Sequence, residues 1–213
     1  MKKIIATIIF AALCLAILYI FFVDGTYRTP VQAIEQARNL DEPIEVVREQ
    51  ETDQGKVVFY LRYIRKSDPK PVISADYVTK TLAGWKWVTG GGHTLMETAD
   101  GMKAQEKLDA EWSVQRIPAE ESSPFPMFFG AVVNPEITMV EVTSTKTASS
   151  MPAEMVRTGT GMRIWYLYVD ESLGEEFTLE ALSAGGQVLS TQQWDGKPVH
   201  AKMRMREEGL NER

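Results

Sequence analysis

The chain has 213 residues, of which 44% are hydrophobic, and a formal net charge of −6, a composition typical of folded globular proteins and not of disordered ones. The acidity argues against nucleic acid and anionic membrane surfaces as partners of the folded part, because like charges repel. Cys14 is the only cysteine, so no intramolecular disulfide can form and burial of apolar side chains must hold the fold together.

Residues 4–23 form an uninterrupted apolar stretch without charge, glycine or proline, preceded by Lys2 and Lys3. A helix of this length, at about 1.5 Å of rise per residue, matches the hydrocarbon core of a bilayer. The sequence therefore predicts a single-pass transmembrane anchor over residues 1–23. The lysine pair favours a cytoplasmic N-terminus, which places the C-terminal part of the chain on the extracytoplasmic side of the cell membrane.

Two other interpretations of this segment stay open. A cleaved signal peptide would have a shorter apolar region and a small-residue cleavage site, whereas this run ends in Tyr19, Phe21 and Phe22. A lipoprotein would be modified at Cys14, but the bulky Leu13 precedes this cysteine and the apolar run continues beyond it.

A short linker, residues 24–28, separates the anchor from a predicted helix. Thr29 as N-cap, followed by proline and then Gln32, forms a capping-box pattern that predicts the start of the helix, and Asn39 predicts its end. Three apolar residues share one face of this helix: Val31, Ile34 and Ala37. This face is expected to pack on a sheet.

The first domain is expected to span residues 27–120 and to combine this helix with an antiparallel sheet. Runs of β-branched and aromatic residues predict its strands at 44–50, 56–65, 72–80, 85–89 and 112–117. Turn signals join the first four strands into two hairpins. The glycine run at 90–92 is expected to break the sheet in a loop that needs positive φ angles, and residues 96–110 are expected to form a loop or a poor helix.

Residues 118–126 contain three prolines and two serines, which predict an exposed connector. The second domain, residues 124–200, has short strands at regular spacing: 127–133, 137–143, 153–158, 162–169, 177–184 and 187–194. Six strands with tight turns and no helix predict a small antiparallel β-sandwich or barrel. Residues 201–213 form a charged tail that is expected to fray. The expected fold class is thus α+β to mainly β.

Two groups of segments carry a resemblance to known proteins. The first is Gly84-Trp85-Lys86-Trp87-Val88 with the glycines that follow it. The second combines Phe129-Gly130 and Asn134-Pro135-Glu136-Ile137 with a later strand that contains Arg163-Ile164-Trp165. With these motifs the chain resembles a group of uncharacterised membrane-anchored extracytoplasmic proteins of Gram-positive bacteria. The resemblance covers most of the exported chain and implies a location and an architecture, but no activity and no catalytic residues.

The sequence shows no motif for catalysis, metal binding or nucleotide binding. His93 and His200 are the only histidines, so a zinc site would need both of them together with carboxylates from opposite ends of the chain. The G-x-S-x-G elbow of a serine nucleophile is absent, and the glycine run lacks the lysine of a phosphate loop. Neighbouring acids at 120–121 and 175–176 are expected on solvated faces. We therefore expect no cofactor, no metal ion and no catalytic residue.

Trp85 and Trp87 are the candidate ligand-binding residues. Residues two apart on a strand share a face, so both indoles would project on one side of the sheet and Lys86 on the other. An exposed pair would form a stacking surface for sugar rings or an apolar peptide, whereas a pair covered by the helix would belong to the core. The core interpretation is favoured, because buried aromatic residues dominate small sheet domains.

The sequence thus predicts a non-enzymatic membrane protein that binds or senses a protein partner at the cell envelope. The alternative is a cell-wall glycan-binding protein that uses Trp85 and Trp87, and a third interpretation is an envelope hydrolase. Ala12 and Ala16 have the small-xxx-small spacing that lets membrane helices approach closely, which allows a homodimer through the anchor.

Overall fold

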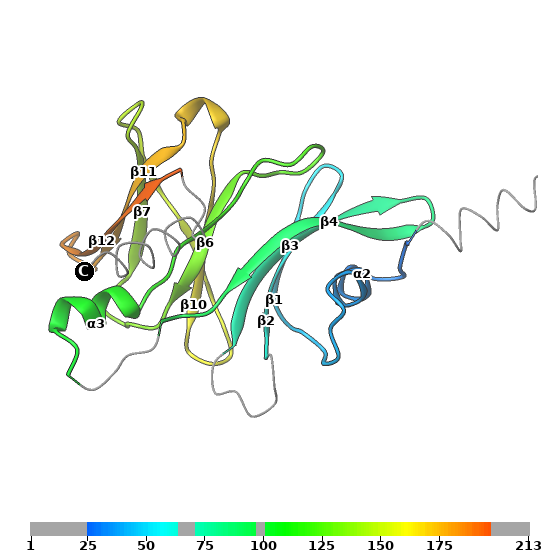
Figure 1. Cartoon of the computed structure of the whole chain (residues 1–213), viewed down its shortest axis with the longest axis horizontal. Coiled ribbons are helices and arrows are strands. Elements are labelled where there is room, and N and C mark those ends of the chain that lie inside the picture. The colour runs from blue at the N-terminus through cyan, green and yellow to red at the C-terminus, as the bar shows by residue number, and fades with distance from the viewer. Residues whose placement is uncertain (1–24, 64–70, 97–100, 197–213) are drawn as a thin grey trace, which may run out of the picture. The chain divides into compact units, whose positions relative to one another are not determined.

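The computed structural model describes residues 25–63, 71–96 and 101–196, which form two units (Figure 1). The predicted anchor at 1–23 and the predicted tail at 201–213 lie outside the described residues. Within the described ranges, no helix has the length and hydrophobicity that a membrane span requires. All strand pairs in these ranges are antiparallel, which confirms the mainly β part of the expected fold class.

In the part of the chain that the structure describes, the first unit consists of one α-helix and a four-stranded sheet in the order β1-β2-β3-β4. Its elements are α2 (Pro30–Ala37), β1 (Glu45–Glu51), β2 (Gly55–Arg62), β3 (Val72–Thr81) and β4 (Gly84–His93). The central strands β2 and β3 are buried along most of their length, whereas the edge strand β1 is largely exposed. The two predicted hairpins are therefore present and form one sheet.

Helix α2 begins and ends where the sequence predicts. The hydroxyl of Thr29 accepts a hydrogen bond from the N–H of Gln32 at 3.1 Å, and Pro30 occupies the first turn. Asn39 follows the helix with a φ angle of 50°, in the left-handed region that ends many helices. Local capping signals were therefore sufficient to locate this helix.

The buried face of α2 differs in part from the predicted one. Ala33 and Ile34 are fully buried and pack on Val58 and Val78 of the sheet. Ala37 is exposed, contrary to prediction, because it is the last residue of the helix and lies beyond the stretch that packs on the sheet.

The glycine run does not break the sheet, and that prediction was wrong. Strand β4 continues through residues 90–92, which pair with β3, and none of these glycines has a positive φ angle. Lack of space explains why these positions are glycine: a Cβ atom on Gly90 would lie 1.6 Å from Oδ1 of Asp76, and one on Gly92 would lie 2.4 Å from Oγ of Ser74. The glycines leave room for polar side chains that β3 buries.

The second unit contains two four-stranded sheets among its described residues. The first sheet has the order β5 (Gln115–Ile117), β6 (Met127–Val132), β10 (Arg163–Tyr168) and β9 (Glu154–Arg157). The second has the order β12 (Val188–Asp195), β11 (Glu176–Leu182), β7 (Met139–Ser144) and β8 (Ser150–Pro152). The unit also has an α-helix, α3 (Ala104–Ala110), in the segment expected to be a loop or a poor helix, and a short 3-10 helix, η1 (Glu171–Leu173).

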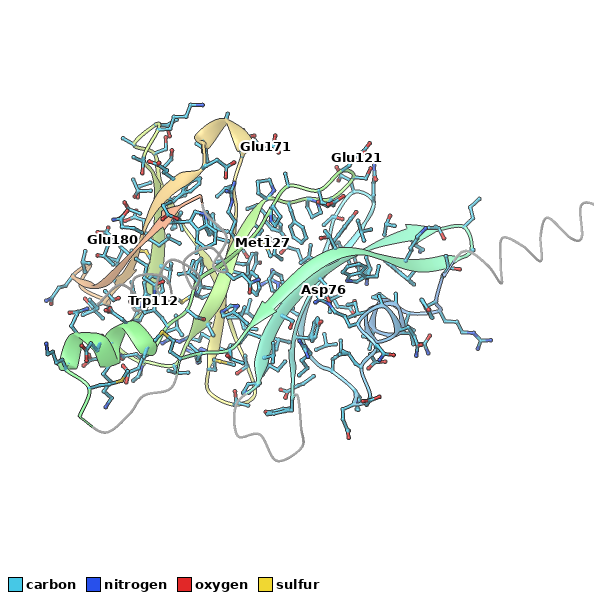
Figure 2. All side chains as sticks on the ribbon, in the orientation of Figure 1. Asp76, Trp112, Glu121, Met127, Glu171 and Glu180 are labelled. Carbon is cyan, nitrogen blue, oxygen red and sulfur yellow. The ribbon has the colours of Figure 1, made fainter. Side chains whose placement is uncertain are left out.

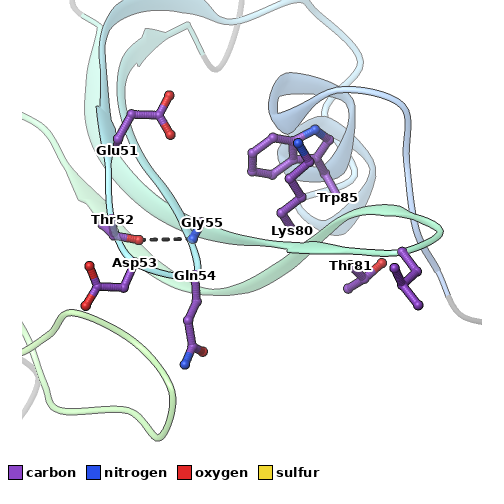
Figure 3. A pocket seen from close by; sticks show the side chains of 9 residues that line it. Glu51, Thr52, Asp53, Gln54, Gly55, Lys80, Thr81 and Trp85 are labelled. Atoms are coloured by element: carbon purple, nitrogen blue, oxygen red, sulfur yellow. Dashed lines mark hydrogen bonds between the residues drawn. The ribbon is translucent and has the colours of Figure 1, made fainter.

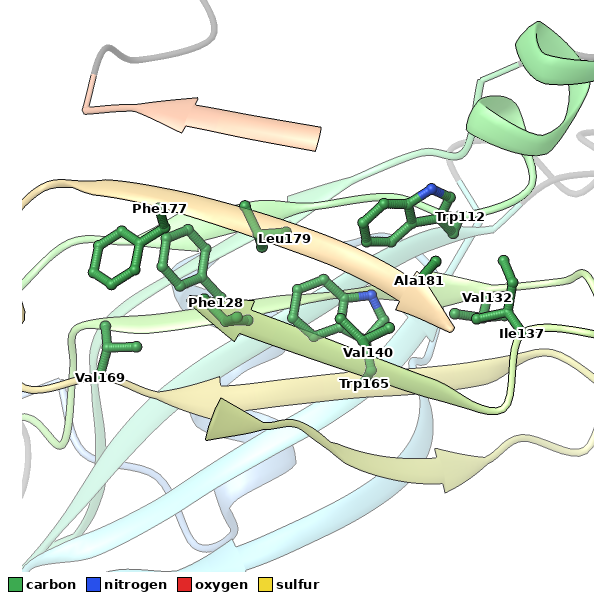
Figure 4. Packing of buried hydrophobic residues seen from close by; sticks show 11 residues of the cluster. Trp112, Phe128, Val132, Ile137, Val140, Trp165, Val169, Phe177, Leu179 and Ala181 are labelled. Carbon is green, nitrogen blue, oxygen red and sulfur yellow. The ribbon is translucent and has the colours of Figure 1, made fainter. Parts of the chain in front are cut away.

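The two sheets of this unit enclose a single core, as in a β-sandwich (Figure 4). Phe128 of β6 meets Phe177 of β11 edge to face, with ring centroids 5.0 Å apart. Trp112 is also buried in this core, and its indole N–H donates to the hydroxyl of Ser190 at 2.8 Å. The core is therefore closed by apolar packing, and the polar edge of Trp112 is satisfied.

The boundary between the units differs from the predicted one. Residues 95–119 belong to the second unit, because β5 pairs with β6 and Trp112 lies between the two sheets. The predicted domains 27–120 and 124–200 therefore divide the chain at the wrong place. Residues 118–126 do lack regular helix or strand, as expected, but they form a loop that leads from β5 to β6.

Candidate functional site

Trp85 lines an open groove of about 590 Å³ at one end of the sheet of the first unit (Figure 3). We call this end, formed by the β1–β2 turn (residues 52–54) and the β3–β4 turn (residues 82–83), the hairpin end. The groove is lined by Glu51, Thr52, Asp53, Gln54, Gly55, Lys80, Thr81, Leu82 and Trp85. Six of the nine lining residues are polar or charged, and one is aromatic.

The indole of Trp85 is half-buried, and two lysines lie over its ring. The Nζ atoms of Lys56 and Lys80 are 5.6 and 5.7 Å from its ring centroid. Lys56 is held there by Glu49 at 2.8 Å and Glu51 at 2.9 Å, and these hydrogen bonds raise the pKa of Lys56. Trp85 is therefore both a wall of the groove and part of a cationic and aromatic cluster.

Trp87 lies on the same side of β4 as Trp85, as the alternation predicts, but does not line the groove. Both indoles pack against the buried cluster beneath α2. The Cζ atom of Arg38 is 5.6 Å from the ring centroid of Trp87, and the indole N–H of Trp87 is buried without a hydrogen-bond partner among the described residues. The structure therefore places the two candidate ligand-binding residues on one side of β4, but only Trp85 lines the groove.

A buried carboxylate, Asp76, lies in the middle of the same sheet (Figure 2). Arg38, just after α2, donates from Nε to Oδ2 at 3.1 Å and also from Nη2 to Oδ1, and the hydroxyl of Tyr60 donates to Oδ2 at 2.6 Å. Burial and the charge of Asp76 raise the pKa of Tyr60. Burial by itself would lower the pKa of Arg38, but the hydrogen bonds and charge of Asp76 raise it. We call these three residues the Asp76 cluster, which fastens α2 to the sheet.

A second groove, of about 310 Å³, lies in the second unit. Its lining contains two cationic side chains and no acid: Val133, Pro135, Arg157, Thr158, Gly161 and Arg163. We call it the cationic groove. The groove lies at the end of β9 and β10. It is lined by two separate parts of the sequence, the Asn134-Pro135 segment and the strand that contains Arg163.

Arg157 and Arg163 stand directly opposite each other on β9 and β10. Residues in this relation have Cβ atoms about 5 Å apart on one face of the sheet, where like charges are destabilising. Arg163 donates to the carbonyl oxygen of Asn134 at 2.5 Å, and neither arginine forms an ion pair with a described residue. Two arginines are therefore paired across neighbouring strands without a counterion from the described part of the chain.

The loop that positions Arg163 is itself well anchored. The side chain of Asn134 donates to Glu111 at 2.8 Å and accepts from the N–H of Glu136 at 2.8 Å. Asn134 is 8% exposed, so the carbonyl group that accepts from Arg163 has a fixed position. The cationic groove is thus preorganised on one side.

Arg157 and Arg163 were not predicted as a site from the sequence. A signal was present, because the two residues are equally distant from Thr160, at the centre of the tight turn 159–161. Residues placed in this way become cross-strand partners in a hairpin. The sequence did not show that the Asn134-Pro135 segment, from a different connection, would form the opposite wall.

The remaining candidates do not form a site in the described ranges. His93 is the last residue of β4, opposite Ile73, and His200 lies outside the described residues. No group of three or more histidine, cysteine or acidic residues in the described ranges could hold a metal ion. Of the acid pairs, Glu175 forms an ion pair with Arg116.

Comparison with known proteins adds no identity: no family model, no curated protein and no solved structure matches this chain. The resemblance to membrane-anchored proteins of Gram-positive bacteria stays a prediction from its motifs.

Proposed function

We propose that this protein is a non-enzymatic interaction module, anchored in the cell membrane by residues 4–23, with both units on the extracytoplasmic side. The cationic groove binds an acidic segment of a protein partner at the envelope. The observation that carries this proposal is the pair of arginines, Arg157 and Arg163, which are cross-strand partners that line one groove and have no acidic partner among the described residues.

The chemistry of the groove favours a carboxylate of an extended peptide. Guanidinium groups match the planar geometry of carboxylates and form charge-assisted hydrogen bonds with them. Val133, which is 44% exposed, and Pro135 supply an apolar wall beside the charges. Strand β9 is at the edge of its sheet, where extended peptides commonly dock. An acidic residue flanked by apolar ones fits these features together.

The proposal is tested by calorimetric titration with two capped peptides that differ only in charge, Val-Glu-Glu-Val and Val-Gln-Gln-Val. We expect the glutamate peptide to bind, more weakly as salt rises, and the glutamine peptide not to bind. Arg157→Gln and Arg163→Gln should each weaken binding roughly tenfold or more, because hydrogen bonds to charged groups contribute about 1.5–3 kcal/mol. Lys107→Gln, an exposed cation on α3 outside the groove, is the matched control and should bind like the wild type.

Equal binding of the two peptides, or unchanged binding to both arginine variants, would contradict the proposed groove. The topology is tested separately by adding protease to intact, wall-stripped cells. The two units should be cleaved from the outside, while the anchor resists extraction by alkaline carbonate. Protection of the whole chain would contradict the proposed orientation.

A second candidate function is glycan binding, favoured by the groove beside Trp85. Sugar sites commonly combine an aromatic ring with polar side chains, as this groove does. The two lysines above the indole would have to move to expose the ring face. If this function holds, Trp85→Ala loses sedimentation with purified cell wall while its urea midpoint stays close to that of the wild type. A lower midpoint with unchanged sedimentation would instead place Trp85 in the core.

A further inference from the structure

We propose that the hairpin end of the first unit rests on the outer surface of the membrane, with the side chain of Leu82 inserted among the lipids. This proposal rests on the proposed function in one respect, the membrane anchor at residues 4–23. It adds a second contact with the bilayer, which fixes the orientation of the sheet of the first unit.

The chain between the apolar segment and the first unit is short. The backbone N–H of Tyr27 donates to the carbonyl of Trp85 at 2.8 Å, and the N–H of Trp85 donates to the carbonyl of Tyr27 at 2.7 Å. Trp85 lies directly beside the β3–β4 turn. Four steps of the chain from Val23 to Tyr27 cover at most about 14 Å, even when fully extended. Tyr27 must therefore lie within that distance of the end of the apolar segment, whatever conformation the connecting residues adopt, and its partner Trp85 is only two residues from the β3–β4 turn.

The β3–β4 turn carries an exposed leucine. Thr81 pairs with Gly84, so Leu82 and Ala83 form a two-residue connection. Turns favour asparagine, aspartate, serine and glycine, which are compatible with water, and neither Leu82 nor Ala83 has a positive φ angle that would restrict the choice of residue. Leu82 instead has a relative exposure of 105%, the highest among the exposed large hydrophobic residues of the described ranges. Packing within the first unit does not explain this leucine, whereas contact with lipid does.

Cationic and aromatic residues surround the β3–β4 turn. Lys80 and Lys86 are exposed on either side of it, and Arg28 is exposed next to Tyr27. Long cationic side chains at a membrane surface reach toward lipid headgroups while their stems contact apolar groups. Tyr27 and Trp85 are paired here, and both residue types are enriched at the boundary between membrane and water.

The net acidity of the chain does not oppose this arrangement. Charges act on a membrane surface over about 8–10 Å at moderate ionic strength, so the local charges at the contact matter more than the total. Asp53, in the neighbouring β1–β2 turn, is an exposed acid at the same end. The anchor also makes the contact intramolecular, so that a weak affinity of one leucine is sufficient to keep the turn on the membrane.

The experiment uses the full chain with Cys14→Ser, reconstituted in vesicles of phosphatidylcholine with a minor fraction of phosphatidylglycerol. A polarity-sensitive fluorophore is attached to Leu82→Cys or to the control Val46→Cys. Val46 is 39% exposed and lies on the edge strand β1, five residues, or about 17 Å, from the end of that strand at Glu51. Both probes therefore report from the same sheet, at different distances from the hairpin end.

We expect the emission of the probe at position 82 to be blue-shifted and quenched by lipids that carry a nitroxide near the headgroup. The probe at position 46 should show neither effect. If the probe at position 82 behaves like the one at position 46 while the protein resists carbonate extraction, the proposed anchor is supported and the proposed membrane contact at Leu82 is wrong. If carbonate extracts the protein, the proposed anchor is wrong, and the proposed contact, which depends on it, is wrong as well.

Discussion

At the residue scale, the buried carboxylate of the Asp76 cluster restricts which residues can surround it. Its carboxylate is fully buried and is matched by the guanidinium of Arg38 and the hydroxyl of Tyr60. A buried carboxylate without such partners would be strongly unfavourable. Gly90 has no side chain because the carboxylate occupies the space where a Cβ atom would lie. Four residues from four elements or connections therefore depend on one another.

Gly90→Ala tests this dependence. The added methyl group would overlap Oδ1 of Asp76 and approach the carbonyl of Ala75 to 2.6 Å, so the cluster or the strand must shift. We expect a loss of unfolding free energy of about 3 kcal/mol or more, measured by urea denaturation. Gly185→Ala is the control, since the nearest atom to its Cβ would be at 3.9 Å, in ordinary contact. A small loss at both positions would contradict the steric role of Gly90.

Tyr60 gives the cluster a dependence on pH. Burial and the adjacent Asp76 raise the pKa of Tyr60 above its value in the unfolded chain. Its contribution is fully present below about pH 10 and decreases above it, because the unfolded chain then releases a proton that the folded protein retains. We expect the urea midpoint of the wild type to fall above about pH 10, and that of Tyr60→Phe to fall less.

The same variant should lose about 1.5–3 kcal/mol of unfolding free energy at pH 7, because the hydrogen bond to a charged acceptor is removed. Identical slopes of stability against pH above pH 10 in both proteins would show that Tyr60 does not titrate differently in the folded state.

At the element scale, β4 has three functions along its length. Its first part pairs with Tyr27 and carries Trp85 beside the groove. Its middle places Trp87 under α2, where Arg38 covers the ring. Its last part, the glycine run, accommodates the Asp76 cluster. The proposed membrane contact is at the turn of the β3–β4 hairpin, whereas the Asp76 cluster lies in the middle of its strands. Each can therefore be tested separately.

At the scale of the whole molecule, the division into units predicts which fragments fold. A fragment of residues 95–196 retains α3, Trp112 and β5, and should show a cooperative thermal transition. A fragment of residues 124–196 lacks Trp112, which is 2% exposed in the intact chain, and β5, which pairs with β6. We expect the shorter fragment to lose about 3–5 kcal/mol or not to fold, as for removal of a buried tryptophan. Equal melting of the two fragments, followed by circular dichroism, would support the boundary at 118–126.

The sequence by itself was sufficient for elements whose signals are local. Thr29 and Asn39 predicted the ends of α2, and alternating apolar residues predicted most strands of both units. Such signals are read within a few residues, because capping hydrogen bonds and side-chain alternation are properties of neighbouring positions. The alternation also placed Trp85 and Trp87 correctly on one face of β4.

Only the tertiary structure determined which residues far apart in the sequence contact one another. The glycine run is a strand because it pairs with β3, where Asp76 leaves no room for a side chain at position 90. Residues 112–117 belong to the second unit because β5 pairs with β6 and Trp112 is buried in the sandwich core. The wall that completes the cationic groove at Arg163 comes from a connection almost thirty residues earlier in the chain, through the carbonyl of Asn134. Contacts of this kind depend on space and pairing partners supplied by other elements, and no periodicity within one segment encodes them.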